Sequence, residues 1–138
     1  MNRVGFQEIS KIRRREASIL LNAGHYQGAY YLVGYAVECA LKACVAKQTK
    51  RHDFPDKKFA EEVYTHDLEK LVKKAGLAPD FDRDKNSDPL LAVNWAVVKD
   101  WKETARYDLG ITVVQARDLF SACTARRSGI LTWIRRRW

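Results

Sequence analysis

Four side chains that can do chemistry recur at helical spacing in one apolar segment. They are two phenols, a carboxylate and an ammonium, namely Tyr31, Tyr35, Glu38 and Lys42, separated by steps of four, three and four residues. This spacing places all four on one face of an α-helix. Glu38 and Lys42 form either a structural ion pair or part of a binding site, because a carboxylate in so apolar a segment is unusual. The spacing alone leaves both interpretations open.

A second polar group, Arg106, Tyr107 and Asp108, follows a helix that we predict at residues 88–101. It lies in a short segment that ends at Gly110, where a side chain can project into a cleft without belonging to the core. A guanidinium in that position offers a bidentate contact to phosphate that lysine does not reproduce. Phosphate is therefore the ligand group that this segment favours.

The two groups together define a candidate ligand-binding site, made of Tyr35, Glu38, Lys42, Arg106 and Tyr107. The cations are expected to hold phosphate, and the phenols to stack on or hydrogen-bond with a base or sugar. Glu38 and Asp108 are expected to orient the arginine or to accept a hydrogen bond from the ligand. For catalysis the spacing offers only Arg106, Asp108 and Glu38. Ordinary carboxylates titrate near pH ~4 and are poorly matched to proton transfer at neutral pH.

None of the common catalytic or metal-binding motifs occurs in the chain. HExxH, GxxxxGK[ST], GxGxxG and GxSxG are all absent. The three cysteines, Cys39, Cys44 and Cys123, have no zinc spacing, so we expect buried thiols in a reducing cytoplasm. His66 is expected to cap or pack at the start of a helix. The sequence thus predicts neither a metal nor a cofactor.

Positive charge exceeds negative charge in this chain. There are 25 Lys and Arg against 17 Asp and Glu, a formal net charge of +8, and the excess is concentrated at residues 13–15, 47–51, 126–127 and 135–137. Such clusters attract phosphate backbones without reading sequence. Arg135, Arg136 and Arg137 are therefore candidate nucleic-acid contacts, with generic solubility or an acidic protein partner as the alternative.

The elements that must position these residues are predicted to be helices, because the hydrophobic period is helical almost throughout. We expect an all-α fold, an up-and-down bundle of four to five helices in one domain spanning residues 1–138. Helices are predicted at residues 6–21, 26–48, 65–76, 88–101 and 112–134, with loops at 49–64 and 77–87. In the first helix the expected inward residues are Ile9, Ile12, Ile19 and Leu20.

The second predicted helix is apolar nearly all round, so we expect it at the centre of the bundle. The longest charge-free apolar run, residues 29–37, is much shorter than the roughly 20 residues that span a bilayer. We therefore expect a cytoplasmic protein without a membrane segment. Surplus apolar surface in so small a domain predicts a homodimer.

Residues 22–43, NAGHYQGAYYLVGYAVECALKA, resemble the second helix of the HEPN (higher eukaryotes and prokaryotes nucleotide-binding) superfamily. Further residues resemble its third and fourth helices, namely His66, Asp67, Leu68, Leu71, Asn94, Trp95, Trp101, Arg106 and Tyr107. The resemblance implies a helical bundle, usually a homodimer, often encoded beside a minimal nucleotidyltransferase and often acting on RNA.

The ribonucleases of that superfamily carry an Arg-x4-6-His motif whose residues meet across the dimer interface. Here no arginine lies five to seven positions before His25, His52 or His66, and no histidine follows Arg106. The expected function is therefore binding of RNA or a nucleotide, within a toxin-antitoxin or defence-type module. The alternatives are a metal-independent ribonuclease with a divergent site, in which Asp108 or Glu38 replaces histidine, and a helical scaffold that binds only a protein.

Overall fold

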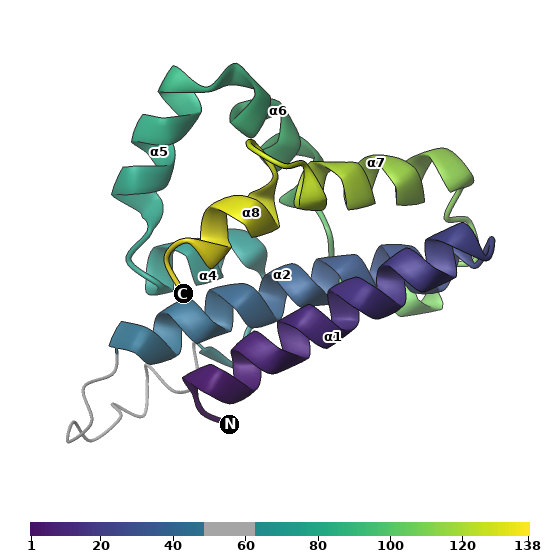
Figure 1. Cartoon of the computed structure of the whole chain (residues 1–138), viewed down its shortest axis with the longest axis horizontal. Helices are drawn as coiled ribbons and strands as arrows, with labels where there is room; N and C mark the ends of the chain where they lie inside the picture. Colours follow the sequence, from purple (N-terminus) through teal and green to yellow (C-terminus); the bar gives the residue numbers. More distant parts are fainter. Residues whose placement is uncertain (49–62) are drawn as a thin grey trace.

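The computed structural model describes residues 1–48 and 63–138, and every regular element within these ranges is a helix. The predicted all-α helical bundle is confirmed (Figure 1). The helices are α1 (Arg3–Asn22), α2 (Tyr26–Gln48), α4 (Leu68–Lys74), α5 (Ala78–Ser87), α6 (Pro89–Val98), the 3-10 helix η1 (Glu103–Tyr107), α7 (Val113–Thr124) and α8 (Ile130–Arg135). The loop predicted at 49–64 and the cationic residues Lys50 and Arg51 fall, apart from residues 63 and 64, outside the described residues.

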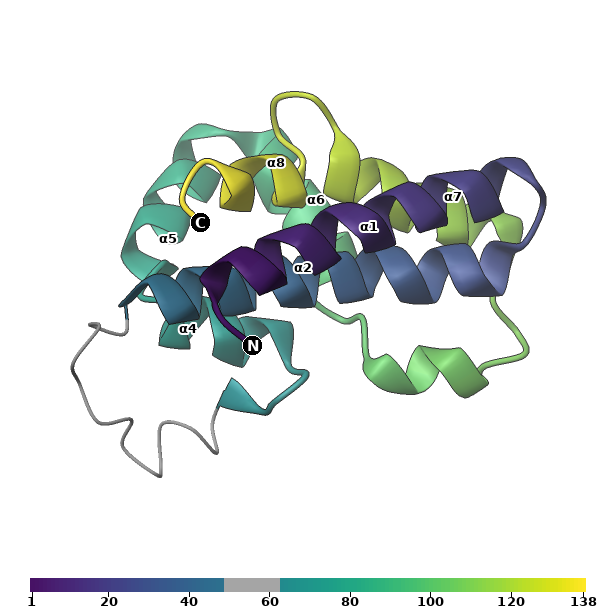
Figure 2. The same ribbon diagram turned by 60° about the horizontal axis from the view of Figure 1, so that its bottom comes forward.

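α2 is the central helix, as its composition predicts. α1 runs beside it, α7 and α8 cover a second side, and α4 and η1 cover a third side (Figure 2). Among the described residues α2 is the one helix long and apolar enough to cross a membrane, and 67% of its most apolar window is buried inside the bundle. Both features suit the core helix of a bundle.

The hairpin between α1 and α2 turns at Gly24, as predicted. Its φ of 84° lies in the left-handed region, which glycine adopts without steric cost. The amide of Gly24 donates to the carbonyl of Leu21 and that of His25 to the carbonyl of Leu20, closing the carbonyl end of α1. α1 and α2 are thereby held side by side and antiparallel.

The prediction for the inward face of α1 is wrong for two of its four residues. Ile19 is 66% exposed and Ile12 is 38% exposed, whereas the residues buried against α2 are Ser10 and Ala17. Small residues let two helix backbones approach closely. The Ser10 hydroxyl donates to the carbonyl of Ala36 at 2.7 Å, which satisfies a buried polar group.

The predicted loop at 77–87 is instead helix α5. Its only large buried side chain is Phe81, and the remaining residues are largely Asp, Lys, Arg and Asn, so it has no apolar stripe to detect. α5 ends at Ser87, and its C-cap residue Asp88 is also the N-cap of α6. The Asp88 carboxylate accepts from the amides of Leu90 and Leu91. This cap confirms the Asp88–Pro89 start predicted for the fourth helix, although α6 ends at Val98, before Trp101.

The single last helix predicted at 112–134 is two helices, α7 and α8. The predicted capping box is present, because Gln115 N donates to the Thr112 hydroxyl and Thr112 N donates to the Gln115 side chain. The chain then reverses after Thr124. A Cβ at Gly129 would lie 2.4 Å from the carbonyl oxygen of Ala125, so only glycine fits this reversal. The reversal folds the apolar residues of α8 back into the core.

Candidate functional site

One side of α2 carries the predicted polar residues, and two other segments lie over it. We call this surface the α2 face. It consists of Tyr31, Gly34, Tyr35, Glu38 and Lys42, with Trp101, Arg106 and Tyr107 over one half and His66 over the other. Figure 2 shows η1 on the opposite side of α2 from α7, so this face is separate from the surface formed by α6 and α7.

Gly34 makes room for Trp101. A Cβ at Gly34 would lie 2.2 Å from the indole Nε1, a distance no side chain tolerates. Trp101 is 1% exposed, and its ring is stacked on Tyr31 at a centroid distance of 6.1 Å. Tyr31 is in turn stacked on Tyr35 at 6.0 Å. The absence of a side chain at position 34 therefore allows an aromatic row to form along α2.

Glu38 is a buried carboxylate, 1% exposed, that contacts an imidazole and an ammonium group. Its Oε1 lies 2.6 Å from His66 Nδ1, and its Oε2 lies 3.4 Å from Lys42 Nζ. The side chain of Lys42 is 12% exposed, whereas that of His66 is 44% exposed. Glu38 cannot reach a ligand directly, so the exposed member of this cluster is the imidazole.

Arg106 projects from η1 toward the solvent. Its Cζ lies 4.9 Å from the centre of the Tyr107 ring, which is itself 72% exposed. The hydroxyls of Tyr31 and Tyr107 raise the pKa of the guanidinium. No carboxylate within residues 1–48 and 63–138 forms an ion pair with Arg106. The guanidinium is positioned by neutral groups and keeps its charge available to a ligand.

Asp108 holds the backbone rather than Arg106. Its carboxylate accepts from the amide of Gly110 at 2.8 Å, and its carbonyl accepts from the side-chain amide of Gln27. These contacts fix the end of η1 against the first turn of α2. Asp108 therefore positions Arg106 only through the backbone.

A hollow of about 450 Å³ lies beside His66, between the start of α4 and the segment that leads into η1. Its charged lining is mixed, with Lys99 and Lys102 against Asp67, Glu69, Asp100 and Glu103. Lys99 lies 3.9 Å from Glu69, so part of this charge is compensated internally. Carboxylates repel phosphate, whereas they accept hydrogen bonds from hydroxyl and amino groups. The hollow thus favours the uncharged part of a ligand.

The Tyr35 hydroxyl lies in an environment that disfavours ionisation. Burial raises its pKa, and the neighbouring Cys39 and Glu38 raise it further. Tyr35 therefore remains a neutral phenol at physiological pH and can act as a hydrogen-bond donor. The thiols are buried as predicted, and burial raises the pKa of Cys39 and of Cys44 to about 11.

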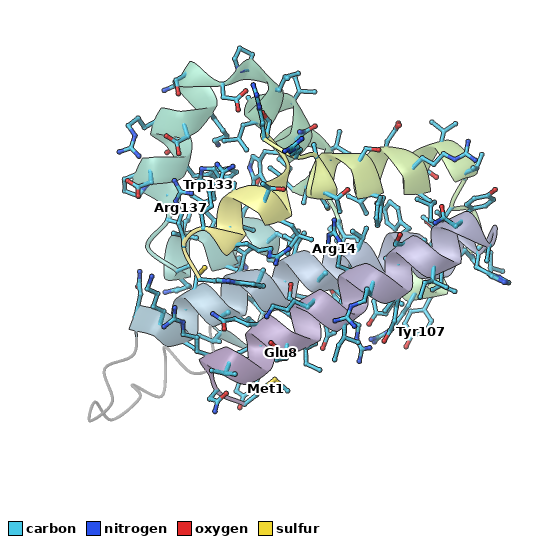
Figure 3. The ribbon with its side chains drawn as sticks, in the orientation of Figure 1. Met1, Glu8, Arg14, Tyr107, Trp133 and Arg137 are labelled. Carbon is cyan, nitrogen blue, oxygen red and sulfur yellow. The ribbon has the colours of Figure 1, made fainter. Side chains whose placement is uncertain are left out.

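The C-terminal arginines differ from one another in their surroundings. Arg135 and Arg136 are exposed, whereas Arg137 stacks over Trp133 at 3.6 Å and forms an ion pair with Asp84 at 3.0 Å. Figure 3 shows Arg137 and Trp133 near α5 and Tyr107 near the far end of α1. These arginines are therefore separate from the α2 face.

The structure brings most of the predicted ligand-binding residues onto one face but not into one contact. Arg106 lies beside Tyr31. Tyr31 precedes Glu38 by seven residues, which is about 10 Å along the axis of α2. Sequence reasoning missed the contact of His66 with Glu38. The available signal was that a carboxylate buried in a helix requires a donor from another segment.

The chain matches no family model, no curated protein and no solved structure. Within the described residues, no group of three or more His, Cys, Asp or Glu side chains is arranged to hold a metal ion.

Proposed function

We propose that the protein binds RNA or a nucleotide on the α2 face, with phosphate at Arg106. The observation that carries the proposal is the exposed Arg106 guanidinium, which has no carboxylate partner among the described residues. An arginine in this state gains most from a phosphate, which accepts two parallel hydrogen bonds in the plane of the guanidinium. Arginines neutralised within the fold gain much less.

The aromatic side chains around Arg106 support a nucleotide rather than a simple anion. Tyr107 is 72% exposed beside the guanidinium, and Tyr35 is partly exposed further along α2. Single-stranded RNA is recognised by unstacked bases that stack on aromatic side chains or on arginine planes. With phosphate at Arg106, the base or sugar lies toward Tyr35 and the hollow beside His66, whose carboxylates accept from its hydroxyl or amino groups.

The charge of the whole chain favours the same class of ligand. A net charge of +8 raises the local concentration of polyanions near the surface. Arg135 and Arg136 are exposed and extend the electrostatic attraction beyond the α2 face. We propose them as additional phosphate contacts, which position RNA without reading its sequence.

The resemblance to the HEPN superfamily supports this proposal and adds a cellular setting. It implies a minimal nucleotidyltransferase encoded nearby, and we propose that the two proteins form a cytoplasmic toxin-antitoxin or defence-type module. Co-expression of this chain with a nucleotidyltransferase encoded beside it tests that setting, with a stable complex as the expected result. Failure of the two proteins to associate contradicts the module while leaving RNA binding open.

The test of ligand binding is fluorescence anisotropy with a labelled single-stranded RNA and with labelled ATP. Arg106→Ala should weaken binding by about 10- to 100-fold, because a charge-assisted hydrogen bond contributes about 1.5–3 kcal/mol. The matched control is Arg117→Ala, which removes an exposed arginine from α7 and should change affinity less than about twofold. Unchanged affinity in Arg106→Ala contradicts the proposal and favours the scaffold that binds only a protein.

A second candidate function, metal-independent cleavage of RNA, is favoured by the contact between His66 and Glu38. A buried carboxylate that holds one imidazole nitrogen fixes the ring and leaves Nε2 for proton transfer. The base would take the proton of a ribose 2′-hydroxyl, whose oxygen attacks the adjacent phosphorus. The bond to the 5′-oxygen then breaks, and that oxygen takes up a proton.

Incubation of labelled RNA with the purified protein distinguishes the two functions. Binding without chemistry predicts intact RNA with and without divalent metal. Cleavage that disappears in His66→Ala and is reduced in Glu38→Gln would establish the ribonuclease instead. Because the Glu38 side chain is only 1% exposed, its variant should lower the rate while leaving RNA affinity nearly unchanged.

A further inference from the structure

Helix α6 is apolar on its outer side as well as on its inner side. Its sequence, PLLAVNWAVV, contains one polar residue, and Leu91, Trp95 and Val98 fill the core. On the opposite side Leu90 is 66% exposed, Val93 is 60% exposed and Val97 is 40% exposed. A helix that is apolar all round is normally covered on all sides. The outer side of α6 therefore lacks its cover in the single chain.

A groove of about 450 Å³ runs between α6 and α7 along this apolar side. Leu90 and Val97 form one wall, and Ala122 and Ala125 contribute small side chains from the α7 side. The one polar residue of α6, Asn94, donates its amide to the carbonyl of Ser128 at 2.8 Å. Because that amide is already bonded within the chain, covering the groove does not deprive it of a partner.

Two opposite charges flank the groove. Asp118 and Arg127 both line it, both are exposed, and neither forms an ion pair with another described residue. Ala125 lies seven residues, about 10 Å, beyond Asp118, and Arg127 follows Ala125. Ser128, next to Arg127, donates to Asp88, the N-cap of α6. Arg127 is thus placed at the amino end of α6, and Asp118 lies about two turns of α7 away from it.

We propose that the surface of α6 and α7 is a two-fold interface between two copies of this chain. In a two-fold interface the same patch meets itself, so each contact between two different residues occurs twice. Asp118 of one copy would face Arg127 of the other copy on both sides of the axis. The apolar residues Leu90, Val93 and Val97 of the two copies would bury one another between these ion pairs.

The charge distribution favours a second copy over a different partner. Two chains of net charge +8 repel each other across most of their surface. The groove itself carries one negative and one positive side chain, Asp118 and Arg127, so its net charge is zero. In a second copy of the chain, the same two side chains provide a charge opposite to each. A partner chosen by charge alone would instead be acidic and would favour the cationic clusters elsewhere. The interface lies on α6 and α7, so it is independent of ligand binding on the α2 face.

Multi-angle light scattering over micromolar concentrations tests the interface on the full chain. The wild type should show twice the chain mass of 15.9 kDa. Val93→Glu should raise the dissociation constant more than about 100-fold, because it places unpaired charges in the interface. The matched control is Ile19→Glu, a change at a 66% exposed isoleucine on α1 that should leave the mass doubled. Circular dichroism verifies that both variants are folded.

A charge exchange separates a two-fold pairing from any other association. Asp118→Arg and Arg127→Asp should each weaken the dimer by about tenfold or more, since each places like charges together. The double variant should recover the wild-type dissociation constant to within about threefold. A monomeric wild type, a dimer that survives Val93→Glu, or a double variant no better than the single variants overturns the proposal.

Discussion

Arg106 and Arg137 place the same pair of groups, a guanidinium and an aromatic ring, at opposite ends of the molecule. At the η1 end, Arg106 lies 4.9 Å from the Tyr107 ring. At the α8 end, Arg137 lies 3.6 Å from the Trp133 ring and 3.0 Å from the Asp84 carboxylate. Asp84 also accepts from the indole Nε1 of Trp133 at 2.8 Å. The carboxylate is therefore what distinguishes the two ends.

This difference shows why a cluster of arginines in a sequence does not identify the arginine that binds a ligand. Arg137 belongs to a cationic run, yet its charge is balanced by a residue 53 positions earlier. Arg106 is the only cation within residues 103–110, and unlike Arg137 it has no carboxylate partner in the described part of the chain. We infer that the Arg137 end serves stability and the Arg106 end serves binding.

The largest expected effect comes from disrupting the η1 end through Gly34→Ala. The new Cβ collides with the buried Trp101 ring, and overpacking of this kind costs about 3 kcal/mol or more. The matched control in the same helix is Gly28→Ala, whose Cβ meets only the methyl end of Leu20 and should cost far less. Urea denaturation of both variants measures the difference. Equal stability of the two variants would contradict the packing of Trp101 on α2.

The next largest effect is that substitutions of the two arginines should change different properties of the protein. Arg137→Ala should lower the free energy of unfolding by about 1–2 kcal/mol, because it removes a stacked ion pair, and should leave RNA affinity nearly unchanged. Arg106→Ala should do the reverse, with unfolding energy within about 0.5 kcal/mol of the wild type. Urea denaturation and fluorescence anisotropy, applied to both variants, measure the two properties. A variant that changes both the unfolding free energy and the RNA affinity would contradict the separate roles of the two arginines.

The predictable part of the molecule followed from local signals. The capping box at Thr112, the proline start at Pro89 and the glycine turn at Gly24 are chemical signatures within a few residues. Two helix predictions failed because the deciding contacts are distant or weak. α5 has almost no apolar stripe, and the break before α8 depends on the space available at Gly129.

The candidate site was predictable in the same limited sense. Helical spacing placed Tyr31, Tyr35, Glu38 and Lys42 on one face, because that relation depends only on the helix period. The partner of Glu38 was not predictable, since His66 lies 28 positions away and only the packing of α4 on α2 brings it near. The interaction of Arg137 with Asp84 was not predictable for the same reason, because the two residues are 53 positions apart.

The smallest expected effect is the pH dependence of the stability that Asp84 contributes at the α8 end. The hydrogen bond from Trp133, aided by Arg83 and Arg137, lowers the pKa of Asp84. A carboxyl group whose pKa is lowered by folding stabilises the protein above its unfolded pKa, about 4, and loses that contribution as pH falls through its folded pKa. Asp84→Asn should therefore be less stable than the wild type at pH 7, and the difference should shrink below pH ~4.

The control for this pH dependence is Asp82→Asn, in the same helix, whose carboxylate is 70% exposed. Its effect on the unfolding energy should be small at both pH values. Denaturation at pH 7 and pH 3 provides the measurement. A difference between Asp84→Asn and wild type that grows in acid would show that Asp84 does not support Arg137 as described.

The most direct test of ligand binding on the α2 face is an NMR titration that follows the tryptophan indole signals. Trp101 packs against Gly34 on the α2 face, whereas the Trp133 indole donates a hydrogen bond to Asp84 at the α8 end. With a short single-stranded RNA added to saturation, we expect the Trp101 indole signal to shift and the Trp133 signal to stay in place. Arg106→Ala should abolish the shift at the same RNA concentration. A Trp101 signal that stays in place at saturating RNA would show that RNA does not bind on the α2 face.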